Sequence, residues 1–159
     1  MSNIENLEPK LVWRHFDRIS KLPRCSKHEE NIRKYIVDFG KKQGLKTKVD
    51  AVGNVFIFKP AASGMQNKPT VILQSHMDMV CEKNSDVEFD FSKDPLQLRI
   101  QGDVLTAVGT TLGADDGIGL AVSLAILEDK KLQHGPIESL YTVDEEIGFT
   151  GVFGIKSNM

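Results

Sequence analysis

The first third of the chain shows the spacing of two amphipathic helices. Apolar residues recur at intervals of four and three over residues 12–19, which predicts a helix that Pro23 brings to an end. Residues 32–39 show the same spacing. Residues 26–29 read SKHE, the Ser-x-x-Glu form of a capping box, so we expect the second helix to begin there.

The period then changes to that of strands. Residues 45–49 and 55–58 are short β-prone runs separated by turn-forming residues, which predicts a hairpin. Residues 70–74 form a short apolar run that is typical of a strand buried on both faces. Residues 104–108 and 137–143 predict two more strands.

A glycine-opened, densely apolar segment over residues 117–128 predicts a helix that packs on more than one side. Helices followed by strands that alternate with a helix indicate an α/β layered domain with a mixed sheet. The longest apolar stretch, residues 118–127, is about half of the roughly 20 residues that a membrane-spanning helix needs. No basic-then-apolar leader opens the sequence, so we expect a soluble, cytoplasmic protein without a membrane partner.

The charge distribution and the cysteine content argue against a nucleic-acid-binding protein and against a disulfide-rich protein. Residues 1–48 carry 12 Lys and Arg against 6 Asp and Glu, whereas residues 49–159 carry 8 against 16. The basic part has few aromatic residues and no arginine cluster, which favours a solvated helix surface over a nucleic-acid partner. Cys25 and Cys81 lie far apart without CxxC spacing, so we expect ordinary small side chains and no disulfide framework.

Three polar clusters each follow a run predicted to be a strand. They are residues 75–80 (SHMDMV), residues 113–119 (GADDGIG) and residues 144–148 (DEEIG). Ligand sites in open α/β sheets collect beyond the carboxyl ends of strands. Three clusters of this kind in one chain therefore predict a common site.

Each cluster alone also has a simpler interpretation. A histidine at a strand end is often only hydrogen-bonded, two aspartates at a helix start can serve as caps, and an acidic turn can be solvated. Together they favour metal chemistry. A carboxylate near a histidine can orient the imidazole, and one aspartate can bridge two divalent cations. Nitrogen and oxygen donors without a thiolate are typical of hydrolytic Zn or Mn sites.

The blocks SHMDMV, GTTLGADDGIG and DEEIG, in that order, resemble the signature blocks of the dizinc exopeptidases, which include carnosinases, aminoacylases and glutamate carboxypeptidases. Within that family the sequence is most similar to the bacterial aminoacyl-histidine dipeptidases. The similarity extends through VGNVFIFKPA, FDFSKDP and HGPIE, and so covers nearly the whole chain. It implies a zinc-exopeptidase-like catalytic domain with three α/β/α layers and a mixed sheet.

The resemblance also implies roles for individual residues. His76 corresponds to the terminal ligand of one metal, Asp115 to the carboxylate that bridges both metals, and Glu146 to a ligand of the second. Asp78 corresponds to the residue that orients the ligating imidazole, and Glu145 to the general base. The implied cofactors are two divalent metal ions, Zn or alternatively Mn or Co. A cis peptide between Asp115 and the next residue is implied as well.

Members of this family are much longer than 159 residues. The resemblance therefore implies that residues 1–159 are the N-terminal part of a catalytic domain, without its C-terminal part and without the lid or dimerisation domain. We expect a metal-dependent dipeptidase for unblocked dipeptides such as Xaa-His, within a parent that is a homodimer. The alternatives are a non-catalytic fragment or metal-binding module, and an aminoacylase or carboxypeptidase-like amidohydrolase.

Overall fold

The structure is a computed structural model that describes residues 4–156. In chain order the elements are η1 (Ile4–Asn6), α1 (Lys10–Ser20), α2 (Glu30–Lys42), β1 (Lys46–Val49), β2 (Val55–Lys59), β3 (Val71–His76), β4 (Leu98–Gln101), β5 (Val104–Ala107), α3 (Ala114–Glu128), β6 (Ile137–Thr142) and α4 (Thr150–Phe153). None of the helices in this part of the chain has the length and apolar character needed to cross a bilayer.

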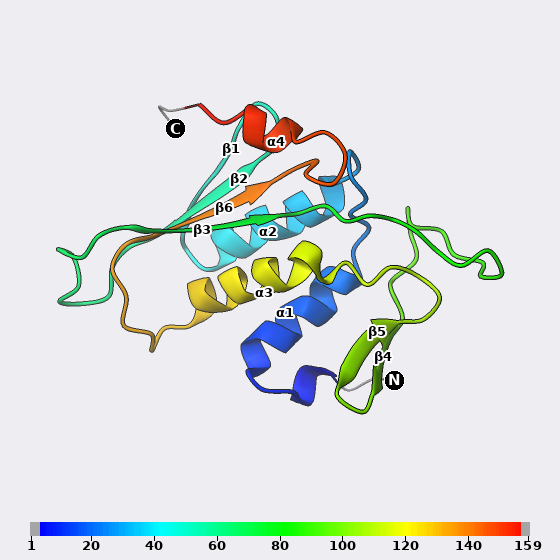
Figure 1. Ribbon diagram of the computed structural model, residues 1–159. Helices are drawn as coiled ribbons and strands as arrows, with labels where there is room; N and C mark the ends of the chain where they lie inside the picture. The colour runs from blue at the N-terminus through cyan, green and yellow to red at the C-terminus, as the bar shows by residue number, and fades with distance from the viewer. Residues whose placement is uncertain (1–3, 157–159) are drawn as a thin grey trace.

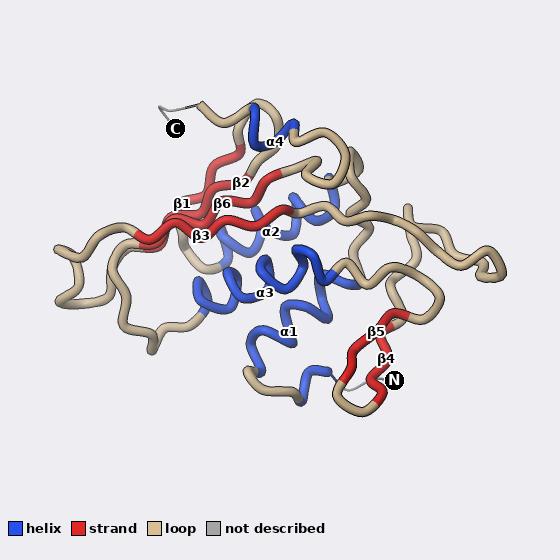
Figure 2. Tube along the Cα trace, in the orientation of Figure 1, coloured by secondary structure: helices blue, strands red, loops and turns tan. Residues whose placement is uncertain are grey.

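Four strands form the main sheet in the order β1-β2-β6-β3 (Figures 1 and 2). β1 pairs antiparallel with β2 as the predicted hairpin, and β2 pairs antiparallel with β6. β3 and β6 run parallel, with Val71 opposite Ile137 and His76 opposite Thr142. The sheet is therefore mixed, and the predicted α/β class is confirmed.

The helices α1, α2 and α3 cover one face of this sheet (Figure 1). The core lies between the helices and the sheet, where alternate strand residues such as Ile57 and Tyr141 meet Phe16, Ile36 and Leu124. Burial of these side chains is the main favourable contribution to folding. Helices covering the second face are absent from residues 4–156, apart from the one-turn α4 beside the end of β6.

Two strand expectations need correction. β3 is the edge strand of the main sheet, and Val71 and Ile72 are 52% and 64% exposed, so the strand predicted for residues 70–74 is not buried on both faces. The strand predicted for residues 104–108 exists as β5, but it pairs with β4 in a separate two-stranded sheet. Local hydrophobicity identifies such strands but does not specify their neighbours.

The predicted capping box is also wrong. α2 begins at Glu30, without a side-chain cap, so His28 lies in the preceding loop and not on a helix. The Ser26 hydroxyl donates to Asp78 Oδ2 at 2.7 Å instead. Glu29 Oε1 accepts from the backbone N–H of Lys27 at 2.8 Å and of Asp144 at 3.0 Å. Both side chains support other loops because tertiary partners compete with local capping.

The two cysteines form a disulfide, contrary to the sequence-based expectation. Cys25 and Cys81 are 56 residues apart, and their Cα atoms lie 5.6 Å from each other. Their segments run side by side, since Cys25 forms a parallel bridge with Met79 and the Met79 N–H donates to the Arg24 carbonyl at 3.0 Å. Spacing in the sequence could not reveal this proximity, because it arises from the packing of two loops.

Candidate metal centre

The parallel pairing of β3 and β6 brings two of the three polar clusters together. His76 ends β3 opposite Thr142 at the end of β6, so the segments that follow the two strands leave the sheet side by side at the carboxyl ends of the strands. Asp78 follows one strand, and Glu145 and Glu146 follow the other. Ligand sites in α/β folds lie at the carboxyl ends of the strands.

The third cluster reaches the site from α3. Asp115 and Asp116 lie in a kink at the start of this helix, where both have non-helical backbone angles, and the peptide between them is cis as the resemblance implied. Asp116 Oδ1 accepts from the Gly119 N–H at 3.1 Å, which caps the regular part of the helix. Asp115 instead lies beside His76. The capping interpretation therefore holds for one aspartate and not for its neighbour.

His76 is the centre of the arrangement. Its side chain is only 8% exposed, and its Nε2 lies 3.1 Å from Asp115 Oδ1 and 3.9 Å from Glu145 Oε2. On the opposite side of the ring, Nδ1 faces Asp78 Oδ1 at 3.3 Å. A carboxylate therefore lies next to each imidazole nitrogen. In metal sites a carboxylate commonly orients a histidine through one ring nitrogen, as Asp78 can do here at Nδ1, while the other nitrogen binds the metal.

Asp78 is buried and holds several parts of the site at once. Its Oδ1 accepts from the Glu145 N–H at 3.0 Å, and its Oδ2 accepts from the Glu146 N–H at 3.1 Å. The Ser26 hydroxyl donates to Oδ2 as well. Asp78 thus fixes the backbone of the acidic DEEIG loop in addition to facing the His76 ring. The resemblance implied only the contact between Asp78 and the His76 ring.

Arg24 and Glu29 are site residues that the sequence analysis missed. Arg24 is 1% exposed, and its guanidinium donates to the carbonyl oxygens of Asp78 at 2.8 Å and Met77 at 3.3 Å, and also to that of Gly113. It therefore joins the segment after β3 to the segment before α3. Glu29 supports the start of the DEEIG loop through the Asp144 N–H. The run PRCSKHE carries these groups, but nothing in its spacing indicates their tertiary partners.

The pKa values reflect the concentration of charge. Burial lowers the pKa of His76, but hydrogen bonds with Asp78 and Asp115 outweigh it and raise the pKa to about 9. Burial disfavours the Asp78 carboxylate, yet hydrogen bonds from His76, Ser26 and the loop N–H groups hold its pKa well below the usual range. Burial raises the pKa of Glu146, and neighbouring carboxylates add to this rise.

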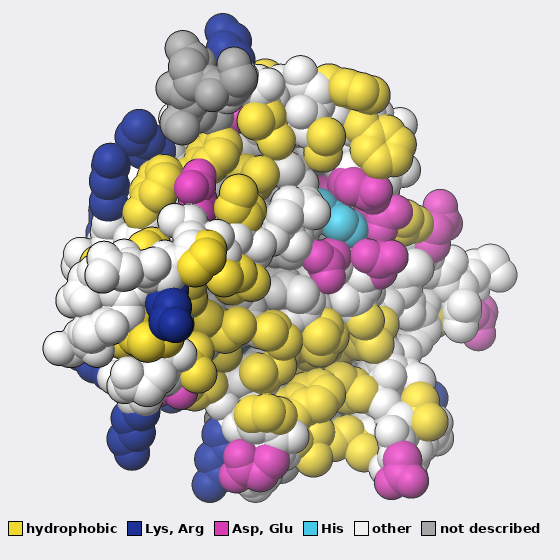
Figure 3. All heavy atoms as spheres, turned by 60° about the vertical axis from the view of Figure 1, so that its left-hand side comes forward, with side chains coloured by type: hydrophobic (Ala, Val, Ile, Leu, Met, Phe, Trp, Pro, Cys, Tyr) yellow, Lys and Arg dark blue, Asp and Glu magenta, His cyan; other side chains and the backbone are white. Residues whose placement is uncertain are grey.

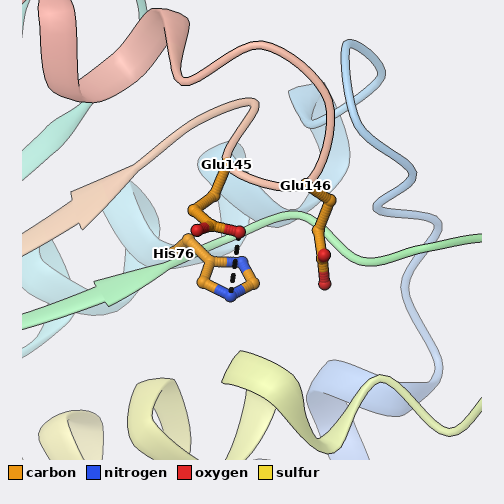
Figure 4. A group of neighbouring side chains, drawn as sticks. All are labelled: His76, Glu145 and Glu146. Atoms are coloured by element: carbon orange, nitrogen blue, oxygen red, sulfur yellow. Dashed lines mark ion pairs between the residues drawn. The ribbon is translucent and has the colours of Figure 1, made fainter.

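The donor set fits a divalent metal ion. One ligand atom each of His76, Glu145 and Glu146 lies within 4.8 Å of the others (Figure 4). The Glu146 carboxylate has no hydrogen bond or ion pair with any residue in the described range 4–156, and Asp115 is 89% exposed beside the ring. Acidic side chains gather around a histidine on this face (Figure 3). Imidazole and carboxylate groups of this kind suit Zn or Mn.

The predicted ligand set and this cluster overlap but are not the same. His76 and Glu146 belong to both. Asp115 is within hydrogen-bond distance of the His76 ring, although it lies outside the compact three-residue group. Glu145, predicted as the general base, lies inside it. The roles of His76, Asp78, Asp115, Glu145 and Glu146 therefore stay predictions.

Comparison with known proteins places the chain in a family. The model of peptidase family M20/M25/M40 matches residues 72–157, more than half of the chain, and this region contains all three polar clusters. The chain belongs to this peptidase family. As an M20/M25/M40 peptidase sequence, it is 48% identical over 158 residues to the cytosol non-specific dipeptidase of Escherichia coli, covering 99% of this chain and 33% of that protein.

Solved structures agree with the family assignment. The aminoacylhistidine dipeptidase of Vibrio alginolyticus matches with a TM-score of 0.95 and 52% identity, over 98% of this chain and 32% of that one. A tripeptidase from Staphylococcus aureus shares the fold, with a TM-score of 0.76 and 23% identity over 94% of this chain and 40% of that one. The M20/M25/M40 chain spans about a third of the length of the dipeptidases that it matches.

Proposed function

We propose that this chain is the N-terminal, metal-binding part of a dinuclear metal dipeptidase that acts on unblocked dipeptides such as Xaa-His. The observation that carries the proposal is the convergence of His76, Asp115, Glu145 and Glu146 at one edge of an M20/M25/M40 fold. The names of the relatives support a dipeptide substrate, since the Escherichia coli protein is a non-specific dipeptidase and the Vibrio alginolyticus protein an aminoacylhistidine dipeptidase.

His76, Asp115 and Glu146 are the proposed ligands of two divalent cations, with zinc as the preferred metal and Mn or Co as alternatives. Asp115, with two carboxylate oxygens and high exposure, is suited to face both cations. A metal pair of this kind lowers the pKa of a water molecule and polarises the scissile carbonyl. Ligating histidine must be neutral, so metal binding would release the proton that His76 holds below a pKa of about 9.

Glu145 is the proposed general base. Its side chain is one third exposed, at 32%, and reaches toward the Nε2 side of the His76 ring. From there it can accept a proton from the attacking water and return it to the leaving amine, without a covalent intermediate. Asp78 is the proposed positioning residue, because its contacts hold both the ring and the backbone of the base.

The remaining expectations are part of the same proposal. Residues 1–159 would be the N-terminal portion of a catalytic domain, and the missing portion would supply further ligands, much of the substrate pocket and a homodimer interface. The proposed compartment is the cytoplasm, by analogy with the cytosol non-specific dipeptidase. No nucleic acid or membrane partner is proposed.

A chimera tests the proposed activity. The third of the Escherichia coli dipeptidase that matches this chain would be replaced by residues 1–159, and hydrolysis of an Xaa-His dipeptide would be measured with added zinc or manganese. Turnover at a rate within about tenfold of the parent is expected. A folded, metal-loaded chimera without turnover would overturn the assignment of catalytic function to this chain.

Two substitutions in that chimera separate the proposed roles. Glu145→Ala should lower kcat by at least about a thousandfold, within the range of losses seen when a catalytic group is removed, while metal content stays near that of the parent. Asp115→Ala should lose metal as well as activity. Equal metal loss in both variants, measured by atomic absorption, would contradict the division into base and bridging ligand.

The alternative functions predict other results in the same assays. Zinc binding by the isolated chain, with no activity in the chimera, would identify a metal-binding module. Hydrolysis of N-acyl amino acids in preference to unblocked dipeptides would identify an aminoacylase-like or carboxypeptidase-like amidohydrolase.

A further inference from the structure

The Cys25–Cys81 disulfide lies next to residues that support the candidate metal centre. Cys81 follows Asp78 by three residues, and Cys25 lies between Arg24 and Ser26. The bond therefore links the loop at residues 23–29, called here the support loop, to the segment that leaves β3 with His76 and Asp78. Neither the proposed metal ligands nor the proposed base uses these sulfur atoms.

Both neighbours of Cys25 contact Asp78. The Arg24 guanidinium donates to the Asp78 carbonyl at 2.8 Å, and the Ser26 hydroxyl donates to Asp78 Oδ2 at 2.7 Å. Asp78 in turn accepts from the N–H groups of Glu145 and Glu146 and faces the His76 ring. Asp78 therefore connects the support loop to the His76 ring and to the acidic loop, and Glu29 of the support loop also contacts the acidic loop through the Asp144 N–H.

Both cysteines are partly exposed, and Cys25 lies at a surface pocket. Cys25 lines a pocket of about 250 Å³ together with Pro23, His28, Phe91 and Ser92, and Cys81 is not among its lining residues. His28 and Ser92 are exposed at this pocket and offer polar groups, whereas Phe91 provides an apolar wall. The pocket therefore gives a small thiol a place to bind beside Cys25.

We propose that the Cys25–Cys81 disulfide is a thiol–disulfide exchange site for low-molecular-weight thiols, and that opening it weakens metal binding at His76 and the acidic loop. A thiolate attacks Cys25 Sγ, a new S–S bond forms to Cys25, and the electron pair of the broken bond leaves on Cys81 Sγ, which takes up a proton. A second thiol then attacks the sulfur of the bound small molecule. This step releases the Cys25 thiol and a small-molecule disulfide, so two thiols are oxidised while one protein disulfide is reduced.

The effect on the metal centre follows from the contacts of Asp78 and rests on the metal site proposed above. Without the covalent link, the support loop is held to the segment after β3 by hydrogen bonds such as that from the Met79 N–H to the Arg24 carbonyl. Greater freedom of Arg24 and Ser26 leaves Asp78 less well fixed. Loss of groups that orient a metal ligand typically costs 10-fold to 100-fold in metal affinity.

The test compares zinc affinity in three forms of the purified chain. The oxidised chain, the Cys25→Ser/Cys81→Ser variant and the Ser26→Ala variant would be titrated with zinc against a chromophoric chelator, at a temperature where circular dichroism shows each to be folded. We expect about tenfold weaker zinc binding in the double variant, which has no thiols that could themselves bind zinc. Ser26→Ala keeps the disulfide, and its affinity should fall in the same direction.

Hydrogen exchange on the wild-type chain supplies a measurement that does not depend on the double variant folding. Reduction with a phosphine should speed exchange of the Glu145 and Glu146 amides, which donate to Asp78, by about tenfold or more. Amides of the central strand β6 should keep their rates. Incubation with reduced glutathione should give a mixed disulfide that peptide mass spectrometry locates on Cys25.

The outcomes separate this inference from the proposed metal site. If the oxidised chain binds no zinc, the proposal that residues 1–159 bind metal by themselves is overturned, and hydrogen exchange still tests the coupling between the disulfide and Asp78. If the oxidised chain binds zinc and the double variant binds it with the same affinity, the disulfide does not affect zinc binding and the inference is overturned. Unchanged exchange at Glu145 and Glu146 on reduction, or a mixed disulfide on Cys81 alone, would overturn it too.

Discussion

At the scale of single residues, Arg24 shows how one buried cation supports the site. Among residues 4–156 it is the largest fully buried side chain, and carbonyl groups of Met77, Asp78 and Gly113 accept from its guanidinium. Burial lowers the pKa of Arg24 to about 10, and the carboxylates of Asp78, Asp116 and Glu146 oppose this shift. The side chain therefore keeps its charge at neutral pH and offsets part of the negative charge around it.

We predict that Arg24→Met lowers the free energy of unfolding by about 3 kcal/mol, because it leaves buried acceptors and carboxylates without their partner. Arg24→Lys should lower the free energy of unfolding by less than Arg24→Met does. The lysine ammonium keeps the positive charge, but it lacks the guanidinium's several donors and cannot bond to both segments at once. Urea denaturation monitored by circular dichroism measures both. Arg99→Met on the exposed surface of β4 is the matched control, with an expected change within about 0.5 kcal/mol. Equal losses for Arg24→Met and Arg99→Met would contradict the role given to Arg24.

At the scale of elements, a polar contact joins the three long helices. His15 of α1 is fully buried, with Nδ1 3.2 Å from the Tyr35 hydroxyl of α2 and Nε2 2.8 Å from Glu128 Oε2 at the end of α3. Arg14 also pairs with Glu128 at 2.7 Å. Burial lowers the pKa of His15 below its ordinary value of 6.5, although Glu128 opposes this shift. The folded state therefore favours the neutral imidazole.

The sign of the resulting pH dependence follows from linkage. Below pH 6.5 the unfolded chain binds a proton at His15 that the folded chain does not, so we predict that stability falls as the pH drops from 6.5 toward the lowered folded pKa. His76 acts in another window, because its folded pKa of about 9 makes it add stability as the pH falls from 9 to 6.5, with no further change below that.

Comparing wild type with His15→Gln isolates the contribution of His15. Urea denaturation between pH 7.5 and 5 should show a smaller loss of stability on acidification in the variant than in the wild type. His28→Gln, at an exposed position in the support loop, is the control and should follow the wild-type curve. Parallel curves for wild type and His15→Gln would contradict the prediction.

The elements and the motif residues were the parts of the molecule that the sequence could predict. Helical spacing over residues 12–19 and 32–39 corresponds to α1 and α2, and the hairpin and β6 lie where they were expected. The contacts that depend on tertiary structure could not be predicted in this way. Ser26 and Glu29 fit a local capping rule but bind distant loops, and the two cysteines meet only because β3 ends beside the support loop. A local pattern specifies which groups are present, whereas packing decides which partner each group finds.

At the scale of the whole molecule, the main sheet exposes an edge strand with apolar side chains, since Val71 and Ile72 of β3 are 52% and 64% exposed. β3 pairs with β6 on one side and with no strand of residues 4–156 on the other. Leu73 packs against the core, so its neighbour Ile72 points to the other face of the strand, where it is exposed. A strand edge with free backbone groups and exposed β-branched side chains is a template for pairing with another chain. We therefore predict that the isolated chain self-associates as its concentration rises.

Sedimentation velocity over a range of concentrations measures this association. Ile72→Lys should shift the distribution toward monomer, because a charge on an edge strand opposes strand pairing between chains. Val104→Lys on β5 is the matched control, since Val104 is similarly exposed at 59% but lies in the separate two-stranded sheet. It should leave the association unchanged. A monomer at all concentrations, or an equal effect of the two lysines, would show that β3 is not the edge through which the chains pair.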